Sequence, residues 1–440
     1  MNNNNRTELA EWAMDYALKC GADESVASVY NSRDIEIEYR DKKLDKLQES
    51  TQNSLNLQIY VSHRYSSHST SDLRKEELKK FIEEAVASTK YLTEDTFRSL
   101  PDPKYYPAKT DIDLKLNDSS YKTIDSAERV KIASEIEKEA MAVSDQIIST
   151  TSGYYDSYYE NVRVHSNGFK GESNGTVFSA GAEVTVKDKD GGRPEDWFYA
   201  TTRFKNEIPS PEILGREAAK RALRKIGQKK IESGKYTMLV ENRASGRMLS
   251  VFSGAMTARA IQQKSSFLDG MLDKKIASEK LTVIDDPFIE KGMGSKLFDG
   301  EGLAAKKRVI IDKGVLKYYF VDNYYGKKLG WEPTTGSPSN LVFEYGTKSL
   351  DELVKDIKKG ILVNGFIGGN SNSTTGDFSF GIVGLLIENG TIIKPVNEMN
   401  ISGNAKEVWN QFVEMGNDPY MYSSWRVPSM LFEDIQFSGI

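Results

Sequence analysis

Apolar residues recur at helical spacing near the start of the chain. A helix is predicted over about 7–19, because its apolar residues lie three and four positions apart. A second helix is predicted to begin near Ser71, with an apolar stripe over 78–86. The same spacing predicts helices over about 126–143 and 211–226.

Runs of β-forming residues, several of them alternating between apolar and polar, predict strands between these helices. The predicted strand segments are 25–31, 34–40, 54–61, 146–168 and 181–188. The glycine-containing turn at 187–192 favours a hairpin. Helix, strand, hairpin and strand therefore occur in the same order twice, on either side of a proline-rich stretch, which indicates a possible internal repeat.

Glycine and β-forming residues dominate after Arg247. Two short turns between apolar runs, 312–314 and 388–390, are typical of β-hairpins. Helices are predicted there only near 349–360 and 405–416. The fold class is therefore predicted to be α+β, with an N-terminal region of helices and antiparallel sheet and a C-terminal domain that is mostly antiparallel sheet or barrel-like.

The length of 440 residues exceeds that of a typical single core, so we expect more than one domain. The predicted parts are an N-terminal α+β domain (1–100), a proline-containing linker (101–120), a central α+β domain (121–230) and a C-terminal β-rich domain (231–440).

Composition narrows the class of protein. The net charge of −5 is weakly acidic, which disfavours a general nucleic-acid-binding surface. Cys20 is the only cysteine, so no intrachain disulfide can form and a reducing compartment fits best. The first residues lack a basic and then apolar leader, and no apolar window has the length of a membrane span. We therefore expect a soluble, cytoplasmic protein.

Few residues suit catalysis. The only histidines are His63, His68 and His165, and no cysteine or carboxylate pair stands near them at metal-ligand spacing, so we interpret them as loop residues rather than metal ligands. Acidic turns at 285–287 and 298–302 could bind a divalent cation, but Asp-Pro and Asp-Gly pairs more often form turns.

The glycine-rich segment 364–379 lacks a phosphate-loop pattern, and its glycines suit tight turns or the close approach of an extended peptide. No G-x-S-x-G sequence indicates a serine nucleophile. From the residues alone, a binding or partner role is favoured over catalysis.

One turn has the position of an active site but not its residues. An apolar strand, 236–240, leads into the polar turn 242–247 and then into a helical pattern, an arrangement in which sites are often built. The turn reads Asn-Arg-Ala-Ser-Gly-Arg and contains no histidine, cysteine or carboxylate.

Several sequence blocks, in this order, resemble the TldD/PmbA family along almost the whole chain. They include "GADES", "QQKSSFLDGMLDKKIASEKLTVIDDP", "FDGEGLAAKKRVIIDKGVLKYYFVDNYYGKKLGWEPTTG", "GNSNSTTGDFSFGIVGLLIENGTIIKPVNEMNISGN" and "PSMLFEDIQFSG". Members of this family have long been labelled modulators of DNA gyrase and are now regarded as two-subunit metallopeptidases.

The polar turn separates the two branches of that family. In the TldD branch the turn reads His-Glu-Ala-x-Gly-His, with two zinc-binding histidines and a glutamate that polarises water. Here Asn242 and Arg247 stand at the histidine positions and Arg243 at the glutamate position. The TldD branch also uses a late cysteine, which this chain lacks. The chain therefore resembles the PmbA branch, also called TldE.

The resemblance implies a non-catalytic subunit of a cytoplasmic two-subunit metallopeptidase that acts on unfolded peptides. Zinc is expected only in a TldD-type partner subunit, so this chain is expected to have no cofactor and no activity alone; the isolated chain could form a homodimer. The candidate peptide-binding residues are Gly368, Gly369, Asn370, Thr375, Gly376 and Asp377.

Two alternatives stay open. The chain could be an independent peptidase or hydrolase with a site near Asp286 and Asp299. It could also be a non-enzymatic modulator of DNA gyrase, although the acidic balance and the lack of a basic helix disfavour binding to nucleic acid.

Overall fold

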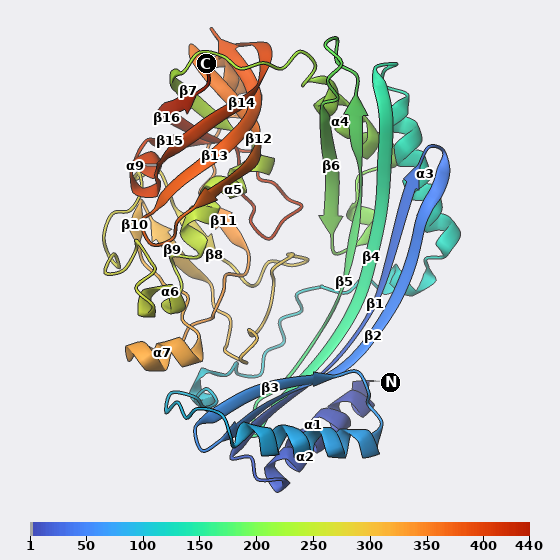
Figure 1. Cartoon of the computed structure of the whole chain (residues 1–440), viewed down its shortest axis with the longest axis vertical. Coiled ribbons are helices and arrows are strands. Elements are labelled where there is room, and N and C mark those ends of the chain that lie inside the picture. The colour runs from blue at the N-terminus through green and yellow to red at the C-terminus, as the bar shows by residue number, and fades with distance from the viewer. Residues whose placement is uncertain (1–2) are drawn as a thin grey trace.

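The computed structural model describes residues 3–440 and consists of a long curved sheet beside a β-barrel (Figure 1). The sheet has six antiparallel strands in the order β3-β2-β1-β4-β5-β6. Its strands are β1 (Glu24–Arg40), β2 (Lys43–Val61), β3 (Arg64–Thr70), β4 (Ile147–His165), β5 (Lys170–Val186) and β6 (Glu195–Thr202). The α+β class predicted from the sequence is confirmed.

The same order of elements occurs twice along this sheet. Each copy is a helix, three antiparallel strands and a helix, and β1 of the first copy pairs with β4 of the second. The helices are α1 (Asn3–Lys19), α2 (Lys75–Thr89), α3 (Ser126–Met141) and α4 (Pro211–Leu223). Residues predicted to form an N-terminal and a central domain therefore share one continuous sheet.

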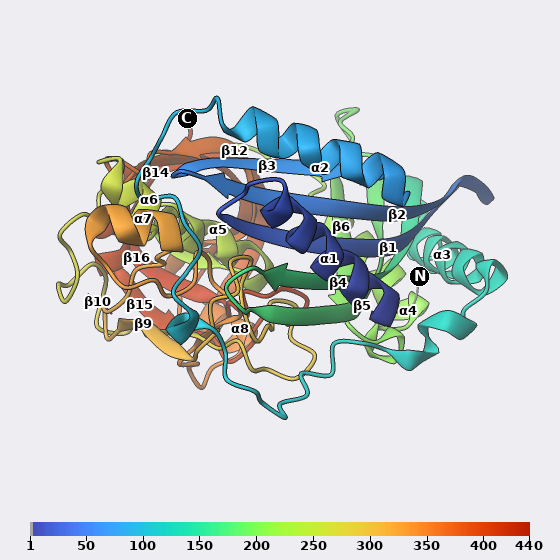
Figure 2. The same cartoon turned by 90° about the horizontal axis from the view of Figure 1, so that it is seen from below.

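All four helices lie on the outer face of the curved sheet, and the inner face is turned toward the barrel (Figure 1). Helices α1 and α2 cover one end, and Figure 2, seen from below, shows them on the near side of the same strands. Helices α3 and α4 cover the other end, where Ile35 and Ile37 of β1 enter the core. No helix within residues 3–440 is both long and apolar enough to cross a membrane.

The proline-rich stretch 101–120 is attached to the rest of the molecule. It contains a short 3₁₀ helix, η1 (Pro103–Tyr105), and leads into a second one, η2 (Ser119–Thr123). Its main chain bonds to the C-terminal half, since Tyr105 O accepts from Ala304 N at 2.9 Å and Leu114 O accepts from Lys291 N at 2.8 Å. A third 3₁₀ helix, η3 (Lys205–Glu207), follows β6.

The C-terminal half contains a closed five-stranded barrel. Its strands are β7 (Gly234–Val240), β12 (Lys359–Ser371), β13 (Asp377–Glu388), β14 (Thr391–Asn404) and β16 (Met430–Ser438). The order is β14-β13-β12-β7-β16, and pairing of β16 with β14 closes the ring. Only β7 and β12 run parallel. A sixth strand, β15 (Phe412–Met415), extends the sheet beyond β16.

Short elements cover the barrel and fill the space beside it. The helices are α5 (Asn242–Ser253), α6 (Ala258–Gln262), α7 (Asn323–Leu329), α8 (Leu350–Lys355) and α9 (Ala405–Asn410). A separate, smaller sheet contains β8 (Val283–Asp285), β9 (Arg308–Asp312), β10 (Val315–Leu316) and β11 (Leu341–Phe343).

The hairpins predicted at 312–314 and 388–390 are confirmed. In each turn a non-glycine residue and the following glycine have positive φ, 45° and 76° for Lys313 and Gly314 and 48° and 72° for Asn389 and Gly390. Such pairs match the twist of two antiparallel strands. The helix predicted over 405–416 is wrong in its second half, where the chain forms β15.

Candidate functional site

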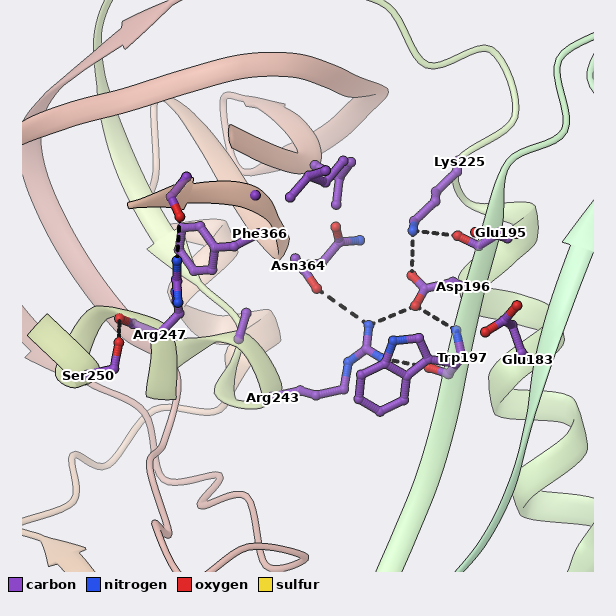
Figure 3. A pocket seen from close by; sticks show the side chains of 16 residues that line it. Glu183, Glu195, Asp196, Trp197, Lys225, Arg243, Arg247, Ser250, Asn364 and Phe366 are labelled. Atoms are coloured by element: carbon purple, nitrogen blue, oxygen red, sulfur yellow. Dashed lines mark hydrogen bonds and ion pairs between the residues drawn. The ribbon is translucent and has the colours of Figure 1, made fainter. Parts of the chain in front are cut away.

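The predicted turn 242–247 is instead the first part of α5, which follows β7 after Glu241 alone, and it lies at a cleft between the curved sheet and the barrel. The cleft has a volume of about 810 Å³. It is lined from the sheet side by Glu183, Glu195, Asp196, Trp197 and Lys225, from α5 by Arg243, Ala244, Arg247 and Ser250, and from the barrel by 364–369 and Val383 (Figure 3). The strand places the turn there because Met238, Leu239 and Val240 are buried in the cores on either side of β7.

Asn242 faces the C-terminal segment rather than the cleft. Its side-chain Nδ2 donates to the main-chain oxygen of Asp418 at 2.7 Å, and its own N–H donates to Ser429 Oγ at 3.1 Å. The Asp418 carboxylate in turn accepts from the Oγ and N–H of Ser429. Asn242 thus fastens the segment around Asp418 and Ser429 to the beginning of α5.

Arg243 reaches across the cleft to β6. Its guanidinium pairs with Asp196 at 2.9 Å, donates to Trp197 O at 2.5 Å and lies over the Trp197 ring at 4.4 Å. Lys225 approaches the same carboxylate from another side at 3.1 Å (Figure 3). Burial alone would raise the pKa of Asp196, but Arg243 and Lys225 outweigh it and hold that pKa below its usual value.

Arg247 lies on the barrel wall of the cleft. Its guanidinium stacks over Phe380 at 4.4 Å and donates to Gly369 O at 3.1 Å. The side chain is exposed, so several of its N–H groups remain open to the cleft. Arg247 therefore adds a positive charge to the barrel wall of the cleft.

The residues at this turn do not fit a zinc ion. Arginine stays protonated and repels a cation, and the Asn242 amide is turned toward a main-chain oxygen. Within residues 3–440, no three His, Cys, Asp or Glu side chains are grouped so that they could hold a metal. A zinc ion placed at residues 242–247 would therefore lack a set of ligands.

The three histidines serve local structure. His63 follows β2 in a turn with φ of 60°, and His68 in β3 bonds to Ser66 at 2.8 Å. His165, at the end of β4, is buried beside Tyr106, whose hydroxyl lies 3.0 Å from His165 Nδ1. Burial, together with nearby Arg163, lowers the pKa of His165 to about 3. His165 is thus a neutral core residue and His68 belongs to a strand, so the prediction of loop histidines holds for His63 and is wrong for the other two.

The glycine-rich segment divides between the cleft and a turn. Gly368 and Gly369 line the cleft, and Asn370 is the next residue of β12. Thr375, Gly376 and Asp377 instead form the connection to β13, where Thr375 Oγ1 donates to Asp377 and Gly376 N donates to Asn372 O. These three are not among the residues that line the cleft.

The acidic turns have structural partners. The Asp286 carboxylate accepts from Phe288 N and pairs with Lys307 at 2.7 Å. The Asp299 carboxylate accepts main-chain N–H groups of Glu301, Leu303 and Gly336, as a turn former does. Burial raises the pKa of Asp299, against the opposing effect of these donors. Both carboxylates are therefore used to shape loops.

Glu301, in the second acidic turn, should make stability depend on pH. Burial raises its pKa from 4.5 to about 7, although Asn323 N donates to it at 2.8 Å. The folded state therefore retains a proton that the unfolded state has lost, so this stabilisation is complete below about pH 4.5 and disappears as pH rises through about 7. We expect Glu301→Gln to become progressively more stable than the wild type from about pH 5 to pH 8, by about 3 kcal/mol at the upper end.

Urea titrations of both proteins across that range would measure the difference. The matched control is Glu279→Gln, which changes an exposed glutamate and should leave the difference constant. A constant difference for Glu301→Gln would contradict the burial of a protonated carboxyl.

The sequence did not indicate the groups that Arg243 contacts. Asp196, Trp197 and Lys225 stand in ordinary polar or alternating stretches, and Asn364 was noted only as part of a glycine-rich segment. They meet because β6 is the last strand of the curved sheet and faces the barrel. No local sequence pattern indicates that these residues lie next to Arg243.

Comparisons with known proteins cover the whole chain. Residues 26–89, 120–226 and 233–439 match domain 1, the central domain and the C-terminal domain of the PmbA/TldA metallopeptidases. A crystal structure from Bacteroides thetaiotaomicron, whose name associates it with modulation of DNA gyrase, is 44% identical, covers 100% of both chains and has a TM-score of 0.97.

More distant relatives agree with this. Metalloprotease PmbA of Escherichia coli O157:H7 is 26% identical over 98% of this chain and 96% of its own. The structure of TldE from Thermococcus kodakarensis is 22% identical, covers 98% of this chain and 100% of its own, and shares the fold with a TM-score of 0.87. Three matching domains in the same order leave one assignment: the chain belongs to the PmbA/TldD family.

Proposed function

We propose that this chain is the metal-free subunit of a two-subunit metallopeptidase, in which a TldD-type partner supplies zinc. The state of the turn at 242–247 carries the proposal. Asn242 and Arg243 are bound to protein groups, and the two arginines place positive charge where the TldD branch binds a cation. The existence of relatives named TldD and TldE supports such a pairing.

We further propose that the cleft holds an extended segment of an unfolded polypeptide. The support comes from β12, which pairs with β7 only over Gly360–Val363, while its distal half continues to pair with β13. Among residues 3–440, no strand pairs with the other edge of that distal half, and main-chain groups of an extended peptide bind to such edges.

The side chains along this edge are consistent with a peptide ligand. Gly368 has open space where a side chain would stand and so leaves room for an approaching main chain, whereas the absent side chains of Gly365 and Gly369 allow close packing against β13. Ile367 and Trp197 are 58% and 44% exposed on opposite walls of the cleft and offer apolar contacts. Recognition would rest on main-chain bonds and apolar contact, which suits substrates of varied sequence.

The proposal predicts that metal and activity depend on the partner. The purified chain should contain no stoichiometric zinc and should not cleave reduced, carboxymethylated α-lactalbumin. After co-expression with a TldD-type subunit carrying the His-Glu-Ala-x-Gly-His turn, the complex should contain about one zinc per pair and cleave that substrate. Zinc would be measured by mass spectrometry and cleavage by gel and peptide analysis.

Two controls test which subunit carries the activity and whether the substrate must be unfolded. A complex whose partner lacks one histidine of its turn should lose zinc and cleavage together, because both are assigned to the partner. Native α-lactalbumin should be spared, because its folded strands are not available for edge pairing. Stoichiometric zinc in this chain alone, or cleavage without the partner, would contradict the proposal and favour an independent hydrolase.

A further inference from the structure

No strand within residues 3–440 pairs with the outer edge of β6, yet three main-chain oxygens of this edge have partners. Three side chains donate to carbonyls at alternate positions: Lys225 Nζ to Glu195 at 2.7 Å, Arg243 Nη1 to Trp197 at 2.5 Å and Tyr420 Oη to Tyr199 at 3.3 Å. Alternate residues of an antiparallel strand direct their main-chain groups to the same edge. Three of the acceptors that an added strand would need are therefore occupied.

Arg243 is the donor that connects separate parts of the molecule. It belongs to α5 beside the barrel, pairs with Asp196 on β6 and also donates to Asn364 O on β12 at 3.5 Å. The side chains of Arg243 and Asp196 are only 7% and 4% exposed. A buried ion pair that has lost one partner leaves the other charge uncompensated, so this contact holds the two walls together strongly.

Asn242 also helps to hold β6 in place, through the C-terminal segment that lies against this strand. It holds Asp418 O at 2.7 Å, and Asp418 and Tyr420 belong to one segment that lies against β6. In addition, Tyr422 packs edge-on against Phe198, with ring centroids 6.2 Å apart. Asn242 and Arg243 thus hold the C-terminal segment and β6 in place.

We propose that Arg243 is a latch that fixes β6 against the barrel, sets the width of the cleft and closes the outer edge of β6 to strand addition. The distal half of β12 is then the edge left for an extended chain, which would bind its main-chain groups other than the oxygens of Asn364 and Gly369, since these accept from Arg243 and Arg247. The latch is a property of this chain by itself and holds whether or not the chain assembles with a zinc-bearing subunit.

Hydrogen exchange measured by mass spectrometry tests the latch. In Arg243→Ala, amides of β6 (195–202) should exchange about 100-fold faster, because the wall of the cleft opens locally. Amides of β1, in the middle of the sheet, should keep their protection and show that the sheet is folded. The matched control is Arg216→Ala on α4, an exposed arginine with ion pairs to Glu139 and Glu212, which should leave β6 unchanged.

A distance measurement gives an independent readout. Spin labels would replace the exposed residues Lys187 and Thr391 in a Cys20→Ser background, one on each side of the cleft. Arg243→Ala should lengthen and broaden the measured distance, and Asp196→Ala should have the same effect. The two substitutions together should lengthen the distance no further than either one, because both remove the same contact. Unchanged β6 exchange with an unchanged distance would overturn the latch, and so would equal loss of protection in β1 and β6.

Discussion

Arg129→Ala is expected to lower the free energy of unfolding by about 3–5 kcal/mol, because it leaves a buried carboxylate without its partner. Arg129 on α3 and Asp156 on β4 form an ion pair at 2.6 Å, with side chains 1% and 0% exposed. The same guanidinium donates to Ile124 O at 2.6 Å, just before the helix begins. The pair therefore fastens α3 to the middle of the sheet.

Denaturant titration of Arg129→Ala would measure this effect. The matched control is Lys131→Ala on the same helix, whose ammonium is exposed and lies 3.8 Å from Glu135. That pair should contribute no more than about 0.5 kcal/mol, because water screens exposed charges. Similar losses for both variants would contradict a dominant role for the buried pair.

Local patterns predicted most of the elements but not how they join. The spacing of apolar residues located α1, α3 and α4, and the two glycine turns located hairpins of the C-terminal half. The segments 25–31 and 34–40 form one strand, β1, because the polar residues between them, Ser32 and Arg33, pair with β2 on one side and with β4 on the other. Pairing of β1 with β4 depends on residues more than a hundred positions apart, and no local pattern encodes it.

Three residues located the candidate site in the sequence. The structure shows which groups these residues contact, and those contacts indicate their roles. Asn242, Arg243 and Arg247 stand out in the sequence as misfits for a metal site. Their contacts with Asp418, Asp196 and Gly369 depend on the tertiary fold and could not be predicted. The structure therefore adds a positive role for residues that the sequence could describe only as substitutions.

Restoring the TldD-type turn, with Asn242→His, Arg243→Glu and Arg247→His together, is expected to destabilise the chain without creating a zinc site. The glutamate replacement would put a second carboxylate beside buried Asp196, with only Lys225 left to compensate both. The loss in free energy of unfolding should exceed the about 3–5 kcal/mol typical of a broken buried pair, because repulsion is added to the lost attraction. Denaturant titration and zinc analysis would measure the two results.

Adding Asp196→Asn to that triple variant separates the two causes. It removes the repulsion between carboxylates while keeping a hydrogen-bond acceptor, so part of the lost stability should return. Zinc should still be absent, because the C-terminal segment near Asp418 has no cysteine and the chain has only Cys20. One zinc per chain at unchanged stability would instead mean that the turn is a dormant metal site. Recovered stability without zinc would show that Arg243 has made the turn part of the framework that holds the sheet and the barrel together.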